Sequence, residues 1–184
     1  MMPTREDAWN LLTVWVSAES LRRHCLAVEA AMRGYAEVYD GDPEAWGIAG
    51  LLHDFDYEKH PHLEQHPVEG VKVLREKGYS EDICEAIMGH GDHTGTPRRT
   101  DMAKCLHAVD ELSGFVVALA HIRPGNFEGM TADSVERSLK KKGFAAAIDR
   151  GAIQRGIDEL GVDRKEHFER VIVALRGAAR ELGF

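Results

Sequence analysis

Apolar residues at helical spacing, interrupted by helix-capping residues, run through most of this sequence and constrain its fold more than any other feature. In the segment 21–35, apolar side chains recur every three or four residues, from Leu21 through Val28 and Met32 to Tyr35. That spacing places them on one face of an α-helix. No segment shows a convincing alternation of apolar and polar residues with the period of two that indicates a half-buried strand. The sequence therefore predicts an all-α fold.

Capping signals divide the chain into about eight or nine helices. Thr4 with Asp7, and Asp163 with Glu166, have the spacing of residues that cap a helix N-terminus, and Asp42 before Pro43 is another typical start. Further starts are expected at Ser20, near Pro67, and at Ser80, Thr100 and Thr131, with another helix around residues 153–160 and helix ends at Gly78 and Gly161. The segments 60–66 and 91–99, rich in His, Gly, Pro and Thr, are predicted loops, and the first leaves room for some helix.

Length, charge and cysteine content narrow the class of protein. The 184 residues fit one domain, because typical domains hold about 100–200 residues, and we expect a single domain over residues 1–184. A net charge of −8 disfavours binding to nucleic acid or to anionic membranes. Three cysteines without a C-x-x-C pair (Cys25, Cys84 and Cys105) indicate free thiols in a reducing compartment.

No segment has the pattern of a targeting or membrane-spanning sequence. Residues 1–7 are polar and charged, without the apolar core of a signal peptide. The longest apolar stretch, residues 115–120, is far shorter than the roughly 20 residues that span a bilayer. We therefore expect a cytoplasmic protein with no membrane partner and no nucleic-acid partner. The sequence leaves the oligomeric state open.

Histidine and aspartate occupy positions that the helical pattern assigns to the core. His24 lies within the apolar stripe of residues 21–35, His53 and Asp54 follow the stripe of residues 46–50, His90 closes that of residues 83–87, and Asp110 lies between Leu106 and Gly114. An unpaired charge is costly to bury, and one divalent cation would satisfy these side chains together. Each position also has a plainer explanation, because a core histidine is often only hydrogen-bonded, Asp110 could pair with a buried arginine, and a His-Asp doublet arises easily by chance.

The order of these residues resembles the HD superfamily of metal-dependent phosphohydrolases. Its ligand pattern is a His on one helix, a His-Asp doublet at the end of the next and a distant Asp, which here are His24, His53 with Asp54, and Asp110. The segments 53–58, 110–115 and 123–125 further resemble stand-alone bacterial members known only as predicted hydrolases. The resemblance implies an HD-like helical bundle with a metal-binding core at about residues 20–120 and a helical extension over residues 121–184.

Some HD proteins hold two metal ions, with additional histidines between the doublet and the last Asp. His66 and His90 match that pattern in order and setting, so the resemblance implies a second ion held by both, with Asp54 as the bridge. The alternative for His66 is a helix cap beside Pro67. The chain lacks the Gly-Tyr-Pro segment of the cyclic-dinucleotide phosphodiesterase branch, which disfavours that substrate. We expect the remaining histidines other than His93 to be surface or locally hydrogen-bonded residues: His60, His62, His107, His121 and His167.

The expected ligand set indicates both the metal and the reaction. Imidazole and carboxylate without thiolate suit one or two ions of Mn, Fe, Co, Ni or Zn better than Mg or Ca. Such ions activate water and polarise a phosphoryl oxygen, so we expect hydrolysis of a phosphate ester of a nucleotide or another small phosphorylated metabolite. Asp54 is then a catalytic ligand and potential bridge, and Asp110 holds and orients the nucleophilic water. Lys59, Asp56 and His93 flank the ligand-bearing loops and are candidates for the general acid.

A basic run stands out in an otherwise acidic chain. It consists of Arg137 and residues 140–142. Arg137 and Lys140 are three residues apart and would share a helix face, so they are candidates for binding the substrate phosphate, together with His93. The alternative is a solvated helix end, where cations suit the helix dipole.

Two other functions are compatible with the same residues. A few HD-fold proteins are di-iron oxygenases that use the same His and Asp ligands, and a degenerate HD fold can serve as a non-catalytic metal- or ligand-binding regulator. Metal analysis with oxygen consumption tests the first, and a substrate screen tests the second. No motif in the expected pocket walls names the substrate.

Overall fold

The computed structural model describes residues 2–184 and is entirely helical over that range, with nine α-helices and no strand. The all-α prediction and the expected number of helices are therefore confirmed. The helices are α1 (Arg5–Trp15), α2 (Glu19–Ala36), α3 (Pro43–Leu52), α4 (Val68–Glu76), α5 (Glu81–Gly89), α6 (Asp101–Ile122), α7 (Ala132–Leu139), α8 (Arg150–Leu160) and α9 (Arg164–Gly177), with a short 3-10 turn at Asp92–Thr94.

Most helix boundaries follow the capping residues. The side chain of Thr4 accepts a hydrogen bond from the backbone of Asp7, and Thr100 caps α6 in the same way through Ala103. The start predicted at Ser20 is wrong, because α2 begins at Glu19 after Ala18, which has no side chain able to cap it. Glu58 instead accepts hydrogen bonds from the backbone just before α2. The loop after α3 therefore fixes the entry to α2.

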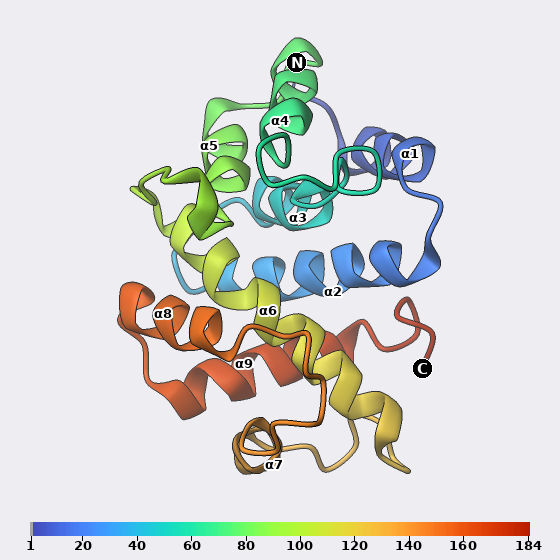
Figure 1. Cartoon of the computed structure of the whole chain (residues 1–184), viewed down its shortest axis with the longest axis vertical. Coiled ribbons are helices and arrows are strands. Elements are labelled where there is room, and N and C mark those ends of the chain that lie inside the picture. The colour runs from blue at the N-terminus through green and yellow to red at the C-terminus, as the bar shows by residue number, and fades with distance from the viewer. Residues whose placement is uncertain (1) are drawn as a thin grey trace.

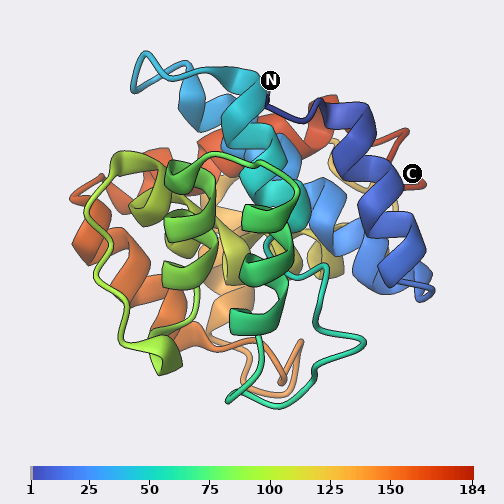
Figure 2. The same cartoon turned by 90° about the horizontal axis from the view of Figure 1, so that it is seen from above.

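Two long helices form the centre of the molecule. In Figure 1, α3, α4 and α5 lie on one side of α2 and α8 and α9 lie on the other, while α6 runs diagonally across α2 from one side to the other. The view from above in Figure 2 shows α6 enclosed by its neighbours, and α6 packs against α2, α5, α8 and α9. Side chains from these helices form one hydrophobic core.

Two glycines allow helices to approach closely near the His and Asp residues that were predicted as metal ligands. A Cβ atom on Gly50 of α3 would stand 2.8 Å from the carbonyl oxygen of Val28 in α2, and one on Gly156 of α8 would stand 2.6 Å from the Cα of Ala108 in α6. Such distances leave no room for a side chain. The contact at Gly50 brings the end of α3 against α2, and the contact at Gly156 brings α8 against α6.

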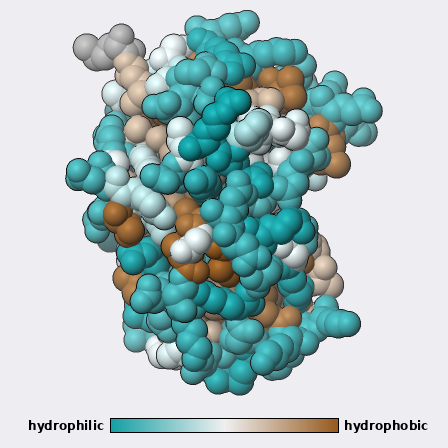
Figure 3. Space-filling view, turned by 90° about the vertical axis from the view of Figure 1, so that its left-hand side faces the viewer, coloured by the Kyte–Doolittle hydropathy of each residue, from teal (hydrophilic) through white to brown (hydrophobic). Residues whose placement is uncertain are grey.

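Helix α6 alone among the described helices is long and apolar enough to cross a membrane, by length and composition. The sequence analysis did not expect such a segment. However, 61% of its most apolar window is buried inside the fold, as in the core helix of a soluble protein. The face shown in Figure 3 is largely hydrophilic, with small, separate apolar patches. The cytoplasmic location stays a prediction.

Candidate metal centre

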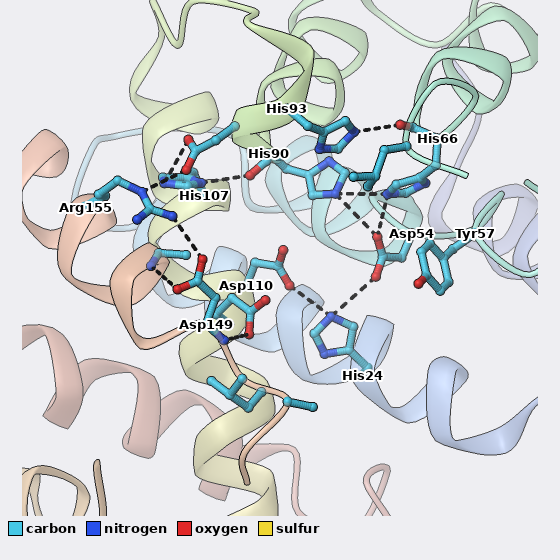
Figure 4. Close-up of a pocket in the computed structure, with 17 residues that line it drawn as sticks. His24, Asp54, Tyr57, His66, His90, His93, His107, Asp110, Asp149 and Arg155 are labelled. Carbon is cyan, nitrogen blue, oxygen red and sulfur yellow. Dashed lines mark hydrogen bonds and ion pairs between the residues drawn. The ribbon is translucent and has the colours of Figure 1, made fainter. Parts of the chain in front are cut away.

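Five elements each direct a His or Asp side chain to one place beside α6. His24 comes from α2, His53 and Asp54 from the end of α3, His90 from the end of α5 and Asp110 from the middle of α6. His66, from the loop before α4, completes the group. The structure therefore brings together all six residues that were predicted from the sequence as metal ligands. Figure 4 shows His24, Asp54, His66, His90 and Asp110 around the cavity.

Two of the histidines are oriented by the helix that they end. His53 Nδ1 lies 2.8 Å from the carbonyl oxygen of Gly50, and His90 Nδ1 lies 2.6 Å from that of Ile87. A carbonyl oxygen only accepts, so each Nδ1 donates and carries a proton. Each Nε2 is then free to offer its lone pair to a metal ion, as is usual for histidine ligands.

The first cluster joins His24, His53, Asp54 and Asp110. His24 Nε2 lies 3.1 Å from His53 Nε2 and 3.0 Å from Asp110 Oδ1. His53 Nε2 lies 3.3 Å from Asp54 Oδ2. Two ring nitrogens and two carboxylate oxygens thus converge from α2, α6 and the end of α3, as the ligands of a transition metal do.

The second cluster uses the other oxygen of Asp54. Asp54 Oδ1 lies 3.2 Å from His66 Nε2 and 3.4 Å from His90 Nε2, and the two ring nitrogens are 3.3 Å apart. One carboxylate therefore faces both clusters, with one oxygen in each. This is the arrangement that a carboxylate bridging two cations requires.

Asp56 supports the second cluster from behind. Its Oδ1 lies 2.7 Å from His66 Nδ1, and its Oδ2 accepts a hydrogen bond of 2.9 Å from the backbone of Gly70. Asp56 is fully buried, and it does not line the cavity. Its proposed role as a general acid is therefore not supported, and its position fits a carboxylate that orients a ligating histidine.

The charges of the two clusters stabilise one another. Burial by itself lowers the pKa of His53, but the negative charges of Asp54 and Asp110 outweigh burial and raise that pKa well above its usual range. Burial by itself raises the pKa of Asp54, but the charge of His53 and hydrogen bonds from the surrounding imidazoles hold it well below its usual range. Hydrogen bonds to Asp54 and Asp56 raise the pKa of His66 to about 9, against the effect of burial. The clusters therefore attract positive charge, which protons or metal ions can supply.

A cavity of about 580 Å³ opens onto both clusters, within the ~300–1,000 Å³ of small-molecule sites. His93 lines it, as expected of a substrate-binding residue, and its Nε2 hydrogen-bonds to the carbonyl oxygen of His66. Tyr57 and Ile148 form further parts of the wall. A small substrate can therefore reach the clusters from solvent.

Three other predicted site residues lie elsewhere. The amino group of Lys59 stands 4.0 Å from the centre of the Trp15 ring and outside the cavity, so the structure does not support a catalytic role for Lys59. Arg137 and Lys140 are exposed on α7 and at its end, also outside the cavity. Their position corresponds to the solvated helix end, which was the alternative explanation of the basic run.

The cavity wall also contains residues that the sequence analysis missed. Asp92, Glu111, Asp149 and Arg155 all line it. His107, expected at the surface or in a local hydrogen bond, is 4% exposed and lines the cavity too, with Nδ1 bonded to the carbonyl oxygen of His90. Its place one helical turn before Asp110 could have indicated this. For the others the sequence held no comparable signal.

His167 is also buried rather than exposed. Its Nδ1 hydrogen-bonds to the hydroxyl of Tyr35, and its Nε2 donates to the carbonyl oxygen of Ala108. Burial lowers the pKa of His167 to about 4. The side chain is thus neutral and ties α9 to α2 and α6, as a locally hydrogen-bonded core residue.

Comparison with known proteins gives one match. The family model described as HD domain matches residues 21–114, which is just over half of the chain and includes all six residues of the two clusters. No curated protein and no solved structure matches the chain.

Proposed function

The chain belongs to the HD-domain family, and from this membership and the two clusters we propose that it is a metal-dependent phosphohydrolase. The substrate class we propose is a small phosphate ester. The observation that carries the proposal is the Asp54 carboxylate, whose two oxygens divide between two sets of inward-facing imidazoles.

The donor set fits divalent transition metals. Three carboxylate oxygens from Asp54 and Asp110 and four imidazole nitrogens are available, and thiolate is absent from both clusters. Cys25 is buried nearby, and burial raises the pKa of its thiol to about 12, so it stays protonated. Nitrogen and oxygen donors of this kind favour Mn, Fe, Co, Ni or Zn. We propose two ions, one in each cluster.

Each of the residues around the cavity has a separate role in the proposed reaction. Divalent cations held here would supply Lewis acidity towards a phosphoryl oxygen and a water of lowered pKa. Asp54 fixes the distance between the two sites, and Asp110 can orient the nucleophilic water by accepting its hydrogen bond. His93 and Tyr57, at the edge of the cavity, are placed to contact the phosphate or its leaving group.

Metal analysis followed by a substrate screen tests the proposal. Protein purified without chelators should contain transition metal, and the metal-loaded protein should release phosphate from at least one member of a phosphoester panel. Asp54→Asn should lose metal and activity while its far-UV circular dichroism stays helical. Asp158→Asn, the same substitution at an exposed position of α8, is the matched control and should behave as wild type. Wild-type protein that binds none of the five metals would refute the proposal.

A di-iron oxygenase is the second candidate, because a carboxylate shared by two metal sites serves iron pairs equally well. Protein loaded anaerobically with Fe²⁺ and then exposed to air distinguishes the two. Substrate-dependent oxygen consumption without phosphate release would favour the oxygenase. Phosphate release that proceeds without oxygen would favour the hydrolase.

A further inference from the structure

One wall of the cavity comes from a part of the chain that lies beyond the matched family region. Ala147, Ile148, Asp149, Ala152 and Arg155 line the cavity from α8 and the loop before it. Residues 21–114 supply both clusters, whereas this wall faces whatever is attached to a bound phosphate.

The wall is held rigidly in place. The guanidinium group of Arg150 donates hydrogen bonds to five backbone carbonyls, that of Leu139 at the end of α7 and those of Lys141, Phe144, Ala145 and Ile148 in the loop before α8. Asp149 caps α8 by accepting from the backbone of Gly151 and Ala152. The backbone of Asp149 also donates to Glu111, the neighbour of Asp110. Asp149 therefore has a fixed position close to the first cluster.

The charge of this wall, taken together with the side chains that pair with it, is negative. Arg155 bridges Asp92 at 2.9 Å and Asp149 at 3.0 Å (Figure 4), and Asp92 also pairs with Arg98, which in turn pairs with Glu159. Three carboxylates and two guanidinium groups leave one negative charge uncompensated. Among the described residues that line the cavity, Arg155 is the one Lys or Arg side chain, and both of its neighbours already neutralise it.

A buried histidine without a partner faces the same carboxylates. His107 Nδ1 donates a hydrogen bond to the carbonyl oxygen of His90. Within residues 2–184 His107 Nε2 has no hydrogen-bond partner, and it lies 3.7 Å from Asp92 Oδ1. A buried polar atom without a partner costs free energy. Towards the cavity the wall thus presents the carboxylates of Asp92 and Asp149, and the guanidinium group of Arg155 between them is already paired with both.

We propose that this wall selects phosphomonoesters whose organic part is neutral or positively charged and carries hydrogen-bond donors, and that it rejects a second anionic group. The inference rests on the proposed function, because it assumes that the metal clusters hold the phosphate. A hydroxyl or ammonium group on the substrate would then meet the carboxylates of Asp92 and Asp149. A carboxylate or further phosphate would face like charge.

Three two-carbon phosphomonoesters of similar size test the proposal. O-phosphoethanolamine ends in an ammonium group, ethyl phosphate in a methyl group, and phosphoglycolate in a carboxylate. Their dissociation constants are measured by calorimetry on Mn²⁺-loaded protein, and KM replaces the dissociation constant for any that is hydrolysed. We expect phosphoethanolamine to bind most tightly and phosphoglycolate roughly tenfold more weakly than ethyl phosphate, because like charges repel. The titrations are made at low ionic strength, because Asp92 and Asp149 are exposed and salt screens exposed charges.

A single substitution assigns the selectivity to the wall. Asp149→Asn keeps the helix cap, since Asn and Asp cap equally well, and keeps an acceptor for Arg155, but it removes the charge. This variant should reduce the ratio of the dissociation constants of phosphoglycolate and phosphoethanolamine at least threefold. Asp163→Asn is the matched control, because Asp163 caps α9 through the same pair of backbone contacts and lies outside the cavity. Asp163→Asn should leave this ratio of dissociation constants unchanged.

The results separate this inference from the proposed function. Phosphoglycolate binding as tightly as phosphoethanolamine would overturn the inference, because Arg155 would then have left its partners to bind the second anion. An unchanged ratio of the two dissociation constants in folded Asp149→Asn would overturn the inference as well. If the binding order is as expected but no phosphoester is ever hydrolysed, the proposed function fails while the selectivity of the wall stands.

Discussion

The support that Asp56 gives to His66 leads to a quantitative prediction. Asp56 accepts two hydrogen bonds, from His66 Nδ1 at 2.7 Å and from the Gly70 backbone at 2.9 Å. Asp56→Asn keeps the size but has one carbonyl oxygen and one amide NH2, so the NH2 must face one of the two donors. A buried hydrogen bond that can no longer form costs about 1–3 kcal/mol. Loss of the carboxylate behind a histidine ligand lowers metal affinity roughly 10–100-fold, which corresponds to about 1.4–2.7 kcal/mol.

The predicted effect is confined to one of the two metal sites. Asp56 contacts His66 in the second cluster and has no hydrogen bond to the first. Calorimetric titration of chelator-stripped Asp56→Asn with Mn²⁺ should show one binding step weakened 10–100-fold, as expected from the histidine support, and one step close to wild type. Asp158→Asn provides the background for an exposed substitution. Equal weakening of both steps, or of neither, would refute the role that we derive for Asp56.

Three further predictions concern stability and the residues outside the cavity. Burial lowers the pKa of His167 to about 4 from 6.5, so the unfolded chain binds more protons at this residue between these values, and the contribution of His167 to the free energy of unfolding should fall by about 2 kcal/mol from pH 7.5 to pH 5. His53 and His66 have raised pKa values that act in the opposite direction, so urea titrations should compare wild type with His167→Gln: the difference in unfolding free energy between these two proteins should change by about 2 kcal/mol over this pH range, and the difference between wild type and the exposed His62→Gln should not. Gly156→Ala would place a Cβ atom 2.6 Å from the backbone of Ala108 and should destabilise the protein by about 1–3 kcal/mol. Gly177→Ala, with open space around it, should not destabilise the protein. Thermal unfolding measures both variants, and equal melting temperatures would contradict the tight contact of α8 with α6. Lys59→Ala should leave metal content and kcat unchanged within about twofold, because the amino group of Lys59 lies over Trp15 and an exposed contact of this kind contributes only about 0.5–1 kcal/mol. A large loss of activity in this variant would show that Lys59 is a catalytic residue.

The helical fold could be predicted from the sequence because its causes are local. Apolar spacing of three and four residues and caps such as Thr4 and Thr100 act within one or two helical turns. Ser20 shows the limit of that reasoning. Its helix begins one residue earlier, and the backbone before it is held by Glu58, which lies about forty residues further along the chain. No local pattern could reveal that contact.

The ligand positions were also visible in the sequence, because polar side chains on apolar helix faces must meet inside the fold. His24, His53 and Asp110 each lie on such a face, and the order of the residues resembled one family. The sequence could not show how the two oxygens of Asp54 are shared, nor that Asp56 turns towards His66. Both depend on side-chain directions set by the packing of α3 against α2.

The wall of the cavity was decided by tertiary structure alone. Lys59 and Arg137 had suitable charge and a suggestive place in the sequence, yet both lie outside the cavity. Asp149 and Arg155 had no distinguishing pattern, because exposed polar residues at the start of a helix look alike in sequence. They reach the cavity because Gly156 lets α8 lie directly on Ala108 of α6. Sequence thus determined which residues enter the core, and helix packing determined which surface residues face the metal ligands.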